Sequence, residues 1–191
     1  MPLREIEFEL SSAQFQQMGY PRMEQGQPLT LILDGGILLP DPGADDWFAV
    51  QEAPLPGHFI QVGRARYAFT GRILEADIFK EAGEETALLL VDCDGVALRI
   101  TCAPQAEGML PFGTWETRTI SGLLRLQGVV EDDFTSAIGK PVGVTLWGFR
   151  RLSLGPGDPF FGQWHESDEL LSTPFHYDRV LINARLHREG I

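Results

Sequence analysis

The sequence predicts a mainly-β protein, and three observations support this prediction. Alternation of apolar and polar residues, which is typical of half-buried strands, recurs along the chain. Tight-turn residues such as Asp-Gly separate apolar runs, as they do in β-hairpins. No long segment has the apolar periodicity of a helix, so only short helices are expected. Together these features predict a β-barrel or sandwich.

The clearest predicted element is a hairpin over residues 86–102, with Asp94 and Gly95 at its turn. Asp-Gly suits a type I′ turn because both central residues must take positive φ. This turn places Cys93 opposite Val96 and sets the register of both strands. One face of the hairpin then carries the apolar residues Leu89, Val91, Cys93, Val96, Leu98 and Ile100. The other face carries Asp92, Arg99 and Thr101, which we expect to be exposed.

The first 39 residues predict a strand, a short helix and a second hairpin. In residues 5–10 the apolar and acidic residues alternate, so we expect one face of this strand to be buried. The other face carries Glu5, Glu7 and Glu9. We expect it to be exposed and to protect a sheet edge from pairing with other strands. Residues 13–18 follow Ser11 and Ser12, which can act as helix N-caps. Residues 29–33 and 37–39 flank Asp-Gly-Gly, which predicts a hairpin turn.

Further strands are expected along the rest of the chain, at residues 47–51, 58–62, 67–79, 115–127, 142–154 and 180–186. The strand at 67–79 changes the parity of its apolar residues, which predicts a bulge or bend near residues 71–74. Residues 103–114 read as a loop, and residues 160–169 as an irregular aromatic segment.

The connector Ala-Pro-Leu-Pro-Gly at residues 53–57 is the best candidate for a boundary. It divides the chain into an N-terminal β segment with a short helix, residues 1–57, and a barrel-like unit with a C-terminal strand, residues 58–191, unless both form one continuous domain. The order of elements over residues 65–154 resembles an oligonucleotide/oligosaccharide-binding (OB) barrel, with a Pro/Gly loop in place of its helix. The resemblance is architectural and carries no functional motif, so no activity follows from it.

The net charge of −12, from 27 acidic and 15 basic residues, makes nucleic-acid binding unfavourable, because phosphates require clustered Lys and Arg. An acidic surface fits a basic protein partner, although solubility is the simpler explanation. No apolar run approaches the ~20 residues of a membrane helix, so no membrane association is expected. Two cysteines on the buried hairpin face, too far apart for a disulfide, fit a reducing compartment, and we expect a soluble cytoplasmic protein.

The sequence lacks several of the common catalytic motifs. It has no G-x-S-x-G, no H-E-x-x-H and no phosphate-binding glycine loop, so we expect no cofactor and favour a non-enzymatic role. A metal site is an alternative, because imidazole and carboxylate suit zinc, manganese or iron. Its candidate ligands are His165, Asp168, Glu169, His176 and Asp178. Their spacing matches no defined motif, and a solvated acidic loop explains the same residues.

A binding face on the barrel is the remaining candidate. Aromatic residues beside arginines can stack on bases, sugars or protein loops, whereas core packing of the aromatics is the competing interpretation. The residues of this predicted face are Trp115, Arg125, Trp147, Phe149 and Arg150. We therefore predict a binding or adaptor protein that engages another protein. The alternatives are a metal-binding protein or enzyme using the C-terminal His and carboxylate residues, and a single-strand nucleic-acid binder.

Overall fold

The computed structural model describes residues 4–11, 22–37, 48–81, 84–102, 118–130, 138–170 and 177–187. Within these ranges the chain forms strands and no helix, which confirms the mainly-β prediction. The strands are β1 (Glu5–Ser11), β2 (Met23–Glu24), β3 (Pro28–Ile37), β4 (Phe48–Gln51), β5 (His58–Gly63), β6 (Arg66–Glu81), β7 (Glu84–Asp92), β8 (Ala97–Cys102), β9 (Thr119–Val130), β10 (Val142–Leu152), β11 (Trp164–Ser167), β12 (Glu169–Leu170) and β13 (Arg179–Leu186). The short helix expected at residues 13–18 and the loop expected at 103–114 lie outside the described residues.

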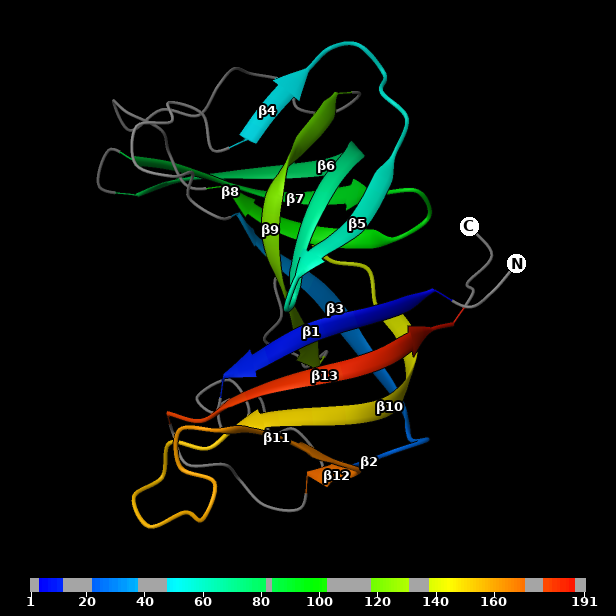
Figure 1. The fold of residues 1–191 in the computed structure, drawn as a ribbon. Helices are drawn as coiled ribbons and strands as arrows, with labels where there is room; N and C mark the ends of the chain where they lie inside the picture. The colour runs from blue at the N-terminus through cyan, green and yellow to red at the C-terminus, as the bar shows by residue number, and fades with distance from the viewer. Residues whose placement is uncertain are drawn as a thin grey trace.

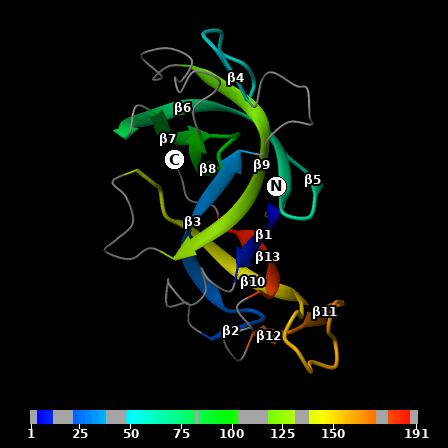
Figure 2. The ribbon, with the colours of Figure 1, turned by 90° about the vertical axis from the view of Figure 1, so that its left-hand side faces the viewer.

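Eleven of these strands belong to one mixed sheet that folds back on itself (Figure 1). The pairing of β6 with β9 completes a circuit of β6, β7, β8, β3 and β9, which we call the upper circuit. The pairing of β3 with β10 completes a second circuit of β3, β10, β13, β1 and β9, the lower circuit. Strands β3 and β9 belong to both circuits, and they run from one half of the molecule into the other (Figures 1 and 2).

Strands from both predicted intervals, residues 1–57 and 58–191, join in this sheet. The N-terminal β1 pairs with the C-terminal β13, from Glu5 opposite Arg185 to Ser11 opposite Arg179. The OB resemblance predicted that the strand now seen as β10 would complete a barrel with β6 to β9. In the structure β3 occupies that position, between β8 and β9, and β10 lies in the lower circuit instead.

The predicted central hairpin is confirmed. Val91 lies opposite Leu98, Leu89 lies opposite Ile100, and the turn residues Asp94 and Gly95 have φ values of 57° and 79°. The six apolar residues of the predicted inner face are all buried. The exposed position expected for Arg99 is wrong, since this residue is buried and its Nη2 donates to Asp34 Oδ2 at 3.0 Å. The reason is that β3 pairs with β8 and brings Asp34 beside Arg99 in the sheet.

The prediction for the first strand is correct for its buried face and wrong for its polar face. Ile6, Phe8 and Leu10 are in the core as predicted. Glu7 and Glu9 are buried as well, with 7% and 6% exposure. Strand β1 is not a sheet edge, because it lies between β13 and β9, so its acidic residues do not protect an edge.

The hairpin predicted at Asp34-Gly35-Gly36 is also wrong, because residues 28–37 form one continuous strand. Gly35 allows close packing, and neither Gly35 nor Gly36 forms a turn. A Cβ atom on Gly35 would lie 2.9 Å from Leu124 Cδ2, so a larger residue would displace a core side chain. Sequence alone could not separate these two uses of glycine.

Two other predictions about strands are confirmed. The register of β6 against β7 shifts between Ile73 and Glu75, which is the bulge predicted near residues 71–74. The C-terminal strand β13 pairs with both β1 and β10, and its alternate apolar residues are buried. The segment at 160–169, expected to be irregular, contains the short strand β11 and the first residue of β12.

Cys93 and Cys102 are free, buried thiols, as predicted. Burial raises the pKa of each thiol from 9.0 to about 12. Among the described residues, no helix has the length and apolar character needed to span a bilayer.

Candidate functional site

A hollow of about 450 Å³ lies on β10 and β13 of the lower circuit and on the adjoining strand β11, and we call it the β10–β13 hollow. This volume is in the range of pockets that bind small molecules. Its lining is about equally polar and apolar. The residues that matter for its chemistry are Gln25, Trp147, Arg150, Glu166, Asp168 and Asn183.

A bulge in β10 turns Trp147 into this hollow. The register of β10 against β13 shifts between Leu146 and Gly148, so Trp147 is an extra residue on its strand. Its two apolar neighbours Leu146 and Phe149 remain in the core, whereas Trp147 is 37% exposed. The Arg185 guanidinium lies 6.0 Å from the centre of the Trp147 ring, and this cation–π contact helps to orient the ring.

Two amide side chains and a carboxylate offer unused hydrogen-bonding groups beside the tryptophan. Asn183 lies opposite Gly148, and a Cβ atom on Gly148 would be 3.9 Å from Asn183 Nδ2. The missing side chain at 148 therefore leaves the Asn183 amide uncovered. Gln25 is held in place by its backbone, because its N–H donates to the carbonyl oxygen of Asp168 at 2.9 Å.

Acidic groups outnumber basic ones around the hollow. Glu7 Oε1 already accepts hydrogen bonds from the Ala65 backbone N–H and from Gln61 Nε2, at 2.8 and 3.2 Å. Arg150 Nε lies 3.9 Å from Glu166 Oε1, and it makes no hydrogen bond within the part of the chain that the structure describes.

The structure brings some of the predicted binding residues together and separates others. Trp147 and Arg150 come together at the hollow. Phe149 also borders it but is only 2% exposed, so it serves mainly as a core residue. Arg125 lies elsewhere, on β9, with its Nε 3.8 Å from Glu9 Oε2. Trp115 lies outside the described residues.

Three of the candidate metal ligands have other partners. Asp178 is buried and accepts hydrogen bonds from Arg151 and from the backbone N–H of Leu154. His165 stacks on Phe160 with ring centres 4.6 Å apart, and Glu169 lies 3.4 Å from Arg22. Asp168 borders the hollow, and His176 is not among the described residues. Within the described ranges no three His, Cys, Asp or Glu side chains are grouped to hold a metal.

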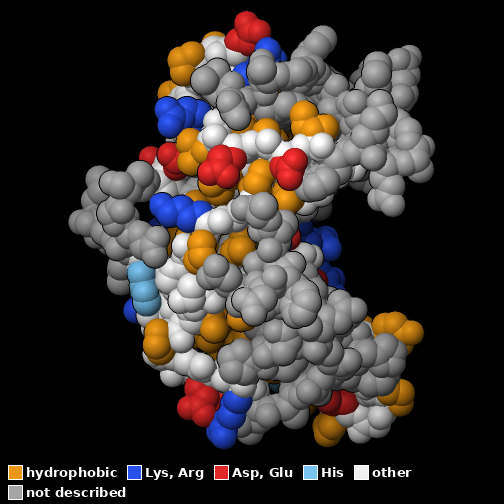
Figure 3. Space-filling view, turned by 180° about the vertical axis from the view of Figure 1, so that it is seen from behind, with side chains coloured by type: hydrophobic (Ala, Val, Ile, Leu, Met, Phe, Trp, Pro, Cys, Tyr) orange, Lys and Arg blue, Asp and Glu red, His pale blue; other side chains and the backbone are white. Residues whose placement is uncertain are grey.

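Residues 155–163 between β10 and β11 form a structured loop, which we call the aromatic loop. Its hydrogen bonds include Gly162 N to the Ser153 carbonyl at 2.7 Å and Phe160 N to Asp158 Oδ1 at 2.8 Å. Phe160 and Phe161 are nevertheless 49% and 58% exposed. The loop extends from the end of the molecule beside β11 (Figure 1), and hydrophobic side chains are visible at the corresponding lower right end in Figure 3.

Sequence reasoning noticed the aromatic character of this segment but assigned it no binding residue. The useful signal was Phe160-Phe161 inside Gly-Pro-Gly-Asp-Pro-Phe-Phe-Gly. Glycine and proline on both sides indicate a turn, and a turn at the surface cannot bury two adjacent aromatic rings in the core.

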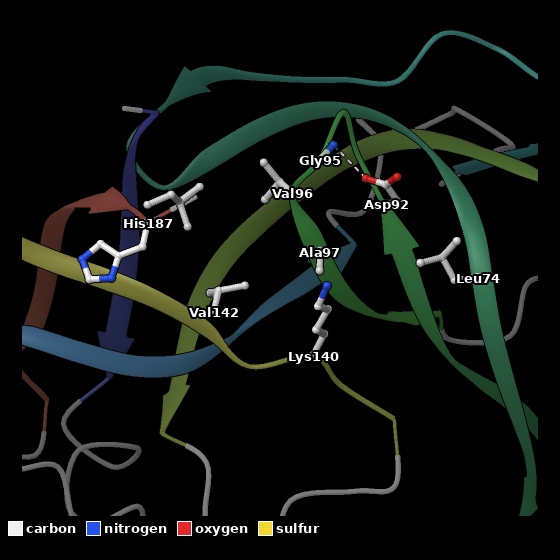
Figure 4. Close-up of a pocket in the computed structure, with 9 residues that line it drawn as sticks. Leu74, Asp92, Gly95, Val96, Ala97, Lys140, Val142 and His187 are labelled. Atoms are coloured by element: carbon white, nitrogen blue, oxygen red, sulfur yellow. Dashed lines mark hydrogen bonds between the residues drawn. The ribbon is translucent and has the colours of Figure 1, made fainter. Parts of the chain in front are cut away.

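A second, smaller hollow of about 90 Å³ lies between the two circuits (Figure 4). Its walls are mostly apolar, with Leu74 on β6 and Val142 on β10, and the Lys140 side chain reaches toward Ala97. Among its polar lining residues, Asp92 already has a partner, because its Oδ1 accepts a hydrogen bond from the Gly95 backbone N–H at 2.8 Å. The volume is well below that of a typical ligand pocket, so we do not assign it a ligand.

Comparison with protein-family models gave no match, and comparisons with curated proteins and with solved structures gave none either.

Proposed function

We propose that this protein binds another protein through the aromatic loop. The observation that carries this proposal is the pair of adjacent, half-exposed phenylalanines, Phe160 and Phe161, on a hydrogen-bonded loop. Aromatic side chains are enriched at the centres of protein interfaces, where a few residues supply most of the binding free energy.

The conformation of the loop supports this role. Gly157 and Gly162 have positive φ values of 84° and 73°, which allow the tight turns, and Asp158 fixes the backbone of Phe160. A loop that is already ordered loses little conformational entropy when it binds, so more of the contact energy appears as affinity. The net charge of −12 favours a partner with a basic surface, because complementary charge accelerates association.

A single-strand nucleic-acid interface has less support. It would use Arg125 and Arg150, which lie 3.8 and 3.9 Å from the carboxylates of Glu9 and Glu166. Nearby carboxylates offset the attraction of these arginines for phosphate.

An affinity-capture experiment tests the proposal. The wild-type chain, the double variant Phe160→Ser/Phe161→Ser and the control Ile60→Ser are each used to capture proteins from native lysate, followed by quantitative mass spectrometry. Ile60 on β5 is 58% exposed, as Phe161 is, so the control removes an equally exposed apolar side chain elsewhere. We expect a partner that is retained by the wild type and the Ile60 variant and lost by the double variant. Equal recovery with all three proteins would contradict the role of the loop.

A further inference from the structure

We propose that the β10–β13 hollow is a binding site for a neutral sugar, a function separate from the protein binding proposed for the aromatic loop. The hollow combines an aromatic ring, uncovered amide groups and a volume of about 450 Å³, which can hold one or two sugar rings.

Trp147 supplies the flat surface that such a ligand needs. One face of a pyranose ring carries C–H groups and is apolar, so it packs against an indole ring, which offers a large rigid contact area. The β10 bulge directs Trp147 away from the core, and Arg185 lies over one face of its ring, so the sugar packs on the other face. Arg185 also donates from its Nε to Glu5 Oε1 at 3.2 Å, an exposed contact that adds modestly to this arrangement. The ring is therefore positioned before any ligand arrives.

The polar groups of the hollow match hydroxyl groups. Each hydroxyl of a sugar both donates and accepts, so its site must present donors and acceptors side by side. The side-chain amides of Asn183 and Gln25 each present both, and Asp168 presents acceptors. None of these three side chains makes a hydrogen bond to another residue that the structure describes, so all three are available to a ligand.

The hollow is lined by charges of both signs, which suits a neutral ligand. An anion would meet Glu7, Glu166 and Asp168, against Arg150 as the one cation of the described lining. A cation would lie close to the Arg150 guanidinium and be repelled by it. Arg185 already occupies one face of Trp147, where a cation could otherwise bind. A wholly apolar ligand would leave the amides and carboxylates desolvated without partners, which is costly. A polyhydroxylated neutral molecule avoids all three penalties.

Gly148 keeps the hollow open, and this provides a direct test. Its backbone does not require positive φ, and a Cβ atom at this position would have Asn183 Nδ2 as its nearest neighbour, at an ordinary contact distance of 3.9 Å. Gly148→Leu should therefore fold normally while its side chain fills the hollow and removes no hydrogen-bonding group.

The experiment is a titration of the full chain, followed by ligand-observed NMR, with glucose, galactose, mannose, N-acetylglucosamine, maltose and lactose. Choline and sulfate serve as cationic and anionic probes. We expect saturable binding of at least one sugar, weakened about tenfold or more by Gly148→Leu and about fivefold by Trp147→Ala, since loss of aromatic contact typically has effects of this size. Phe161→Ser and Ile60→Ser should keep the wild-type affinity within about twofold.

The melting midpoint of each variant shows whether it is folded. If Trp147→Ala does not fold, the sugar affinity of Gly148→Leu alone tests the proposal. Saturation by no sugar, binding of choline or sulfate in place of sugars, or unchanged sugar affinity in Gly148→Leu would each overturn the proposal. Because Phe161→Ser leaves the hollow intact, loss of partner capture in that variant with retained sugar binding would separate this site from the aromatic loop.

Discussion

Leu98 is a residue whose contribution to stability follows directly from its position. It is fully buried in the central hairpin, opposite Val91. Leu98→Ala should lower the free energy of unfolding by about 2–5 kcal/mol, because it removes buried methyl groups and leaves a cavity. Urea denaturation measures this loss, and a loss below about 1 kcal/mol would place Leu98 outside the core.

Its neighbour Arg99 should also matter, in contrast to what the sequence pattern predicts. Arg99 is 9% exposed and bonds to Asp34 on β3 at 3.0 Å. Arg99→Ala should cost about 1–3 kcal/mol, since it leaves the Asp34 carboxylate without this partner. A double-mutant cycle with Asp34→Ala isolates the interaction. Additive effects of the two substitutions would show that the ion pair contributes nothing.

Because the two thiols are buried, we expect the free energy of unfolding to fall at high pH. Burial raises the pKa of Cys93 and Cys102 from 9.0 to about 12, so the folded protein keeps both protons where the unfolded chain releases them. Stability is therefore fully present below pH 9 and declines as pH rises toward 12, by roughly 1.4 kcal/mol per pH unit for each thiol. Urea denaturation at pH 8, 9, 10 and 11 measures this slope.

The double variant Cys93→Ala/Cys102→Ala is the control for this pH dependence. Its absolute stability is lower because the side chains are smaller, but its slope between pH 9 and 10 should be nearly flat. Tyr67, whose pKa burial raises from 10.0 to about 12, contributes above pH 10 in both proteins. An equal slope in the variant below pH 10 would show that the thiols are not responsible.

Sequence alternation predicted which residues face the core, but not whether the opposite face is covered. Ile6 and Leu98 were placed correctly, because a period of two is a local property. Glu7, Glu9 and Arg99 were expected at the surface and are buried, since β1 and β8 have neighbours that no local pattern specifies. Charged residues in such a position are stabilised by partners from distant strands, as Arg179 shows by donating to Glu9 Oε2 at 2.8 Å.

At the level of elements, prediction succeeded where a turn or a parity change defines the strand. The Asp94-Gly95 turn and the β6 bulge at residues 73–75 are examples. It failed at Gly35, which permits packing against Leu124 although the pattern indicated a turn. For the site, Trp147 and Arg150 were identified together, but the β10 bulge that turns Trp147 outward and Phe149 inward was not predicted.

Strand β13 should be indispensable to the fold. It pairs with β1 along seven positions and with β10 on its other side, and Val180, Ile182 and Ala184 are in the core. Deletion of residues 179–191 would expose two strand edges and the inner face of the lower circuit, so we expect insoluble protein. A soluble truncated protein with an unchanged melting midpoint would show that β13 adds nothing to the core.

For the whole molecule, the central feature is the sharing of β3 and β9 by both circuits. The connector at residues 53–57 left open whether the chain has two parts or one continuous domain, and strands from both sides of it pair along β3 and β9. Pairing between strands far apart in the sequence depends on the complete fold, so the sequence could predict the strands but not this topology. The aromatic loop extends from this framework at the end of the lower circuit (Figure 1).

Site-specific photo-cross-linking in cells tests most directly whether the aromatic loop contacts a protein partner. Phe161 and, as control, Ile60 are each replaced by p-benzoylphenylalanine, which reacts only with groups in contact with it. Both positions are 58% exposed, so accessibility alone predicts equal labelling. We predict a discrete cross-linked complex from position 161 and none from position 60. A complex formed from position 60 alone, or from neither position, would contradict the proposed role of the loop.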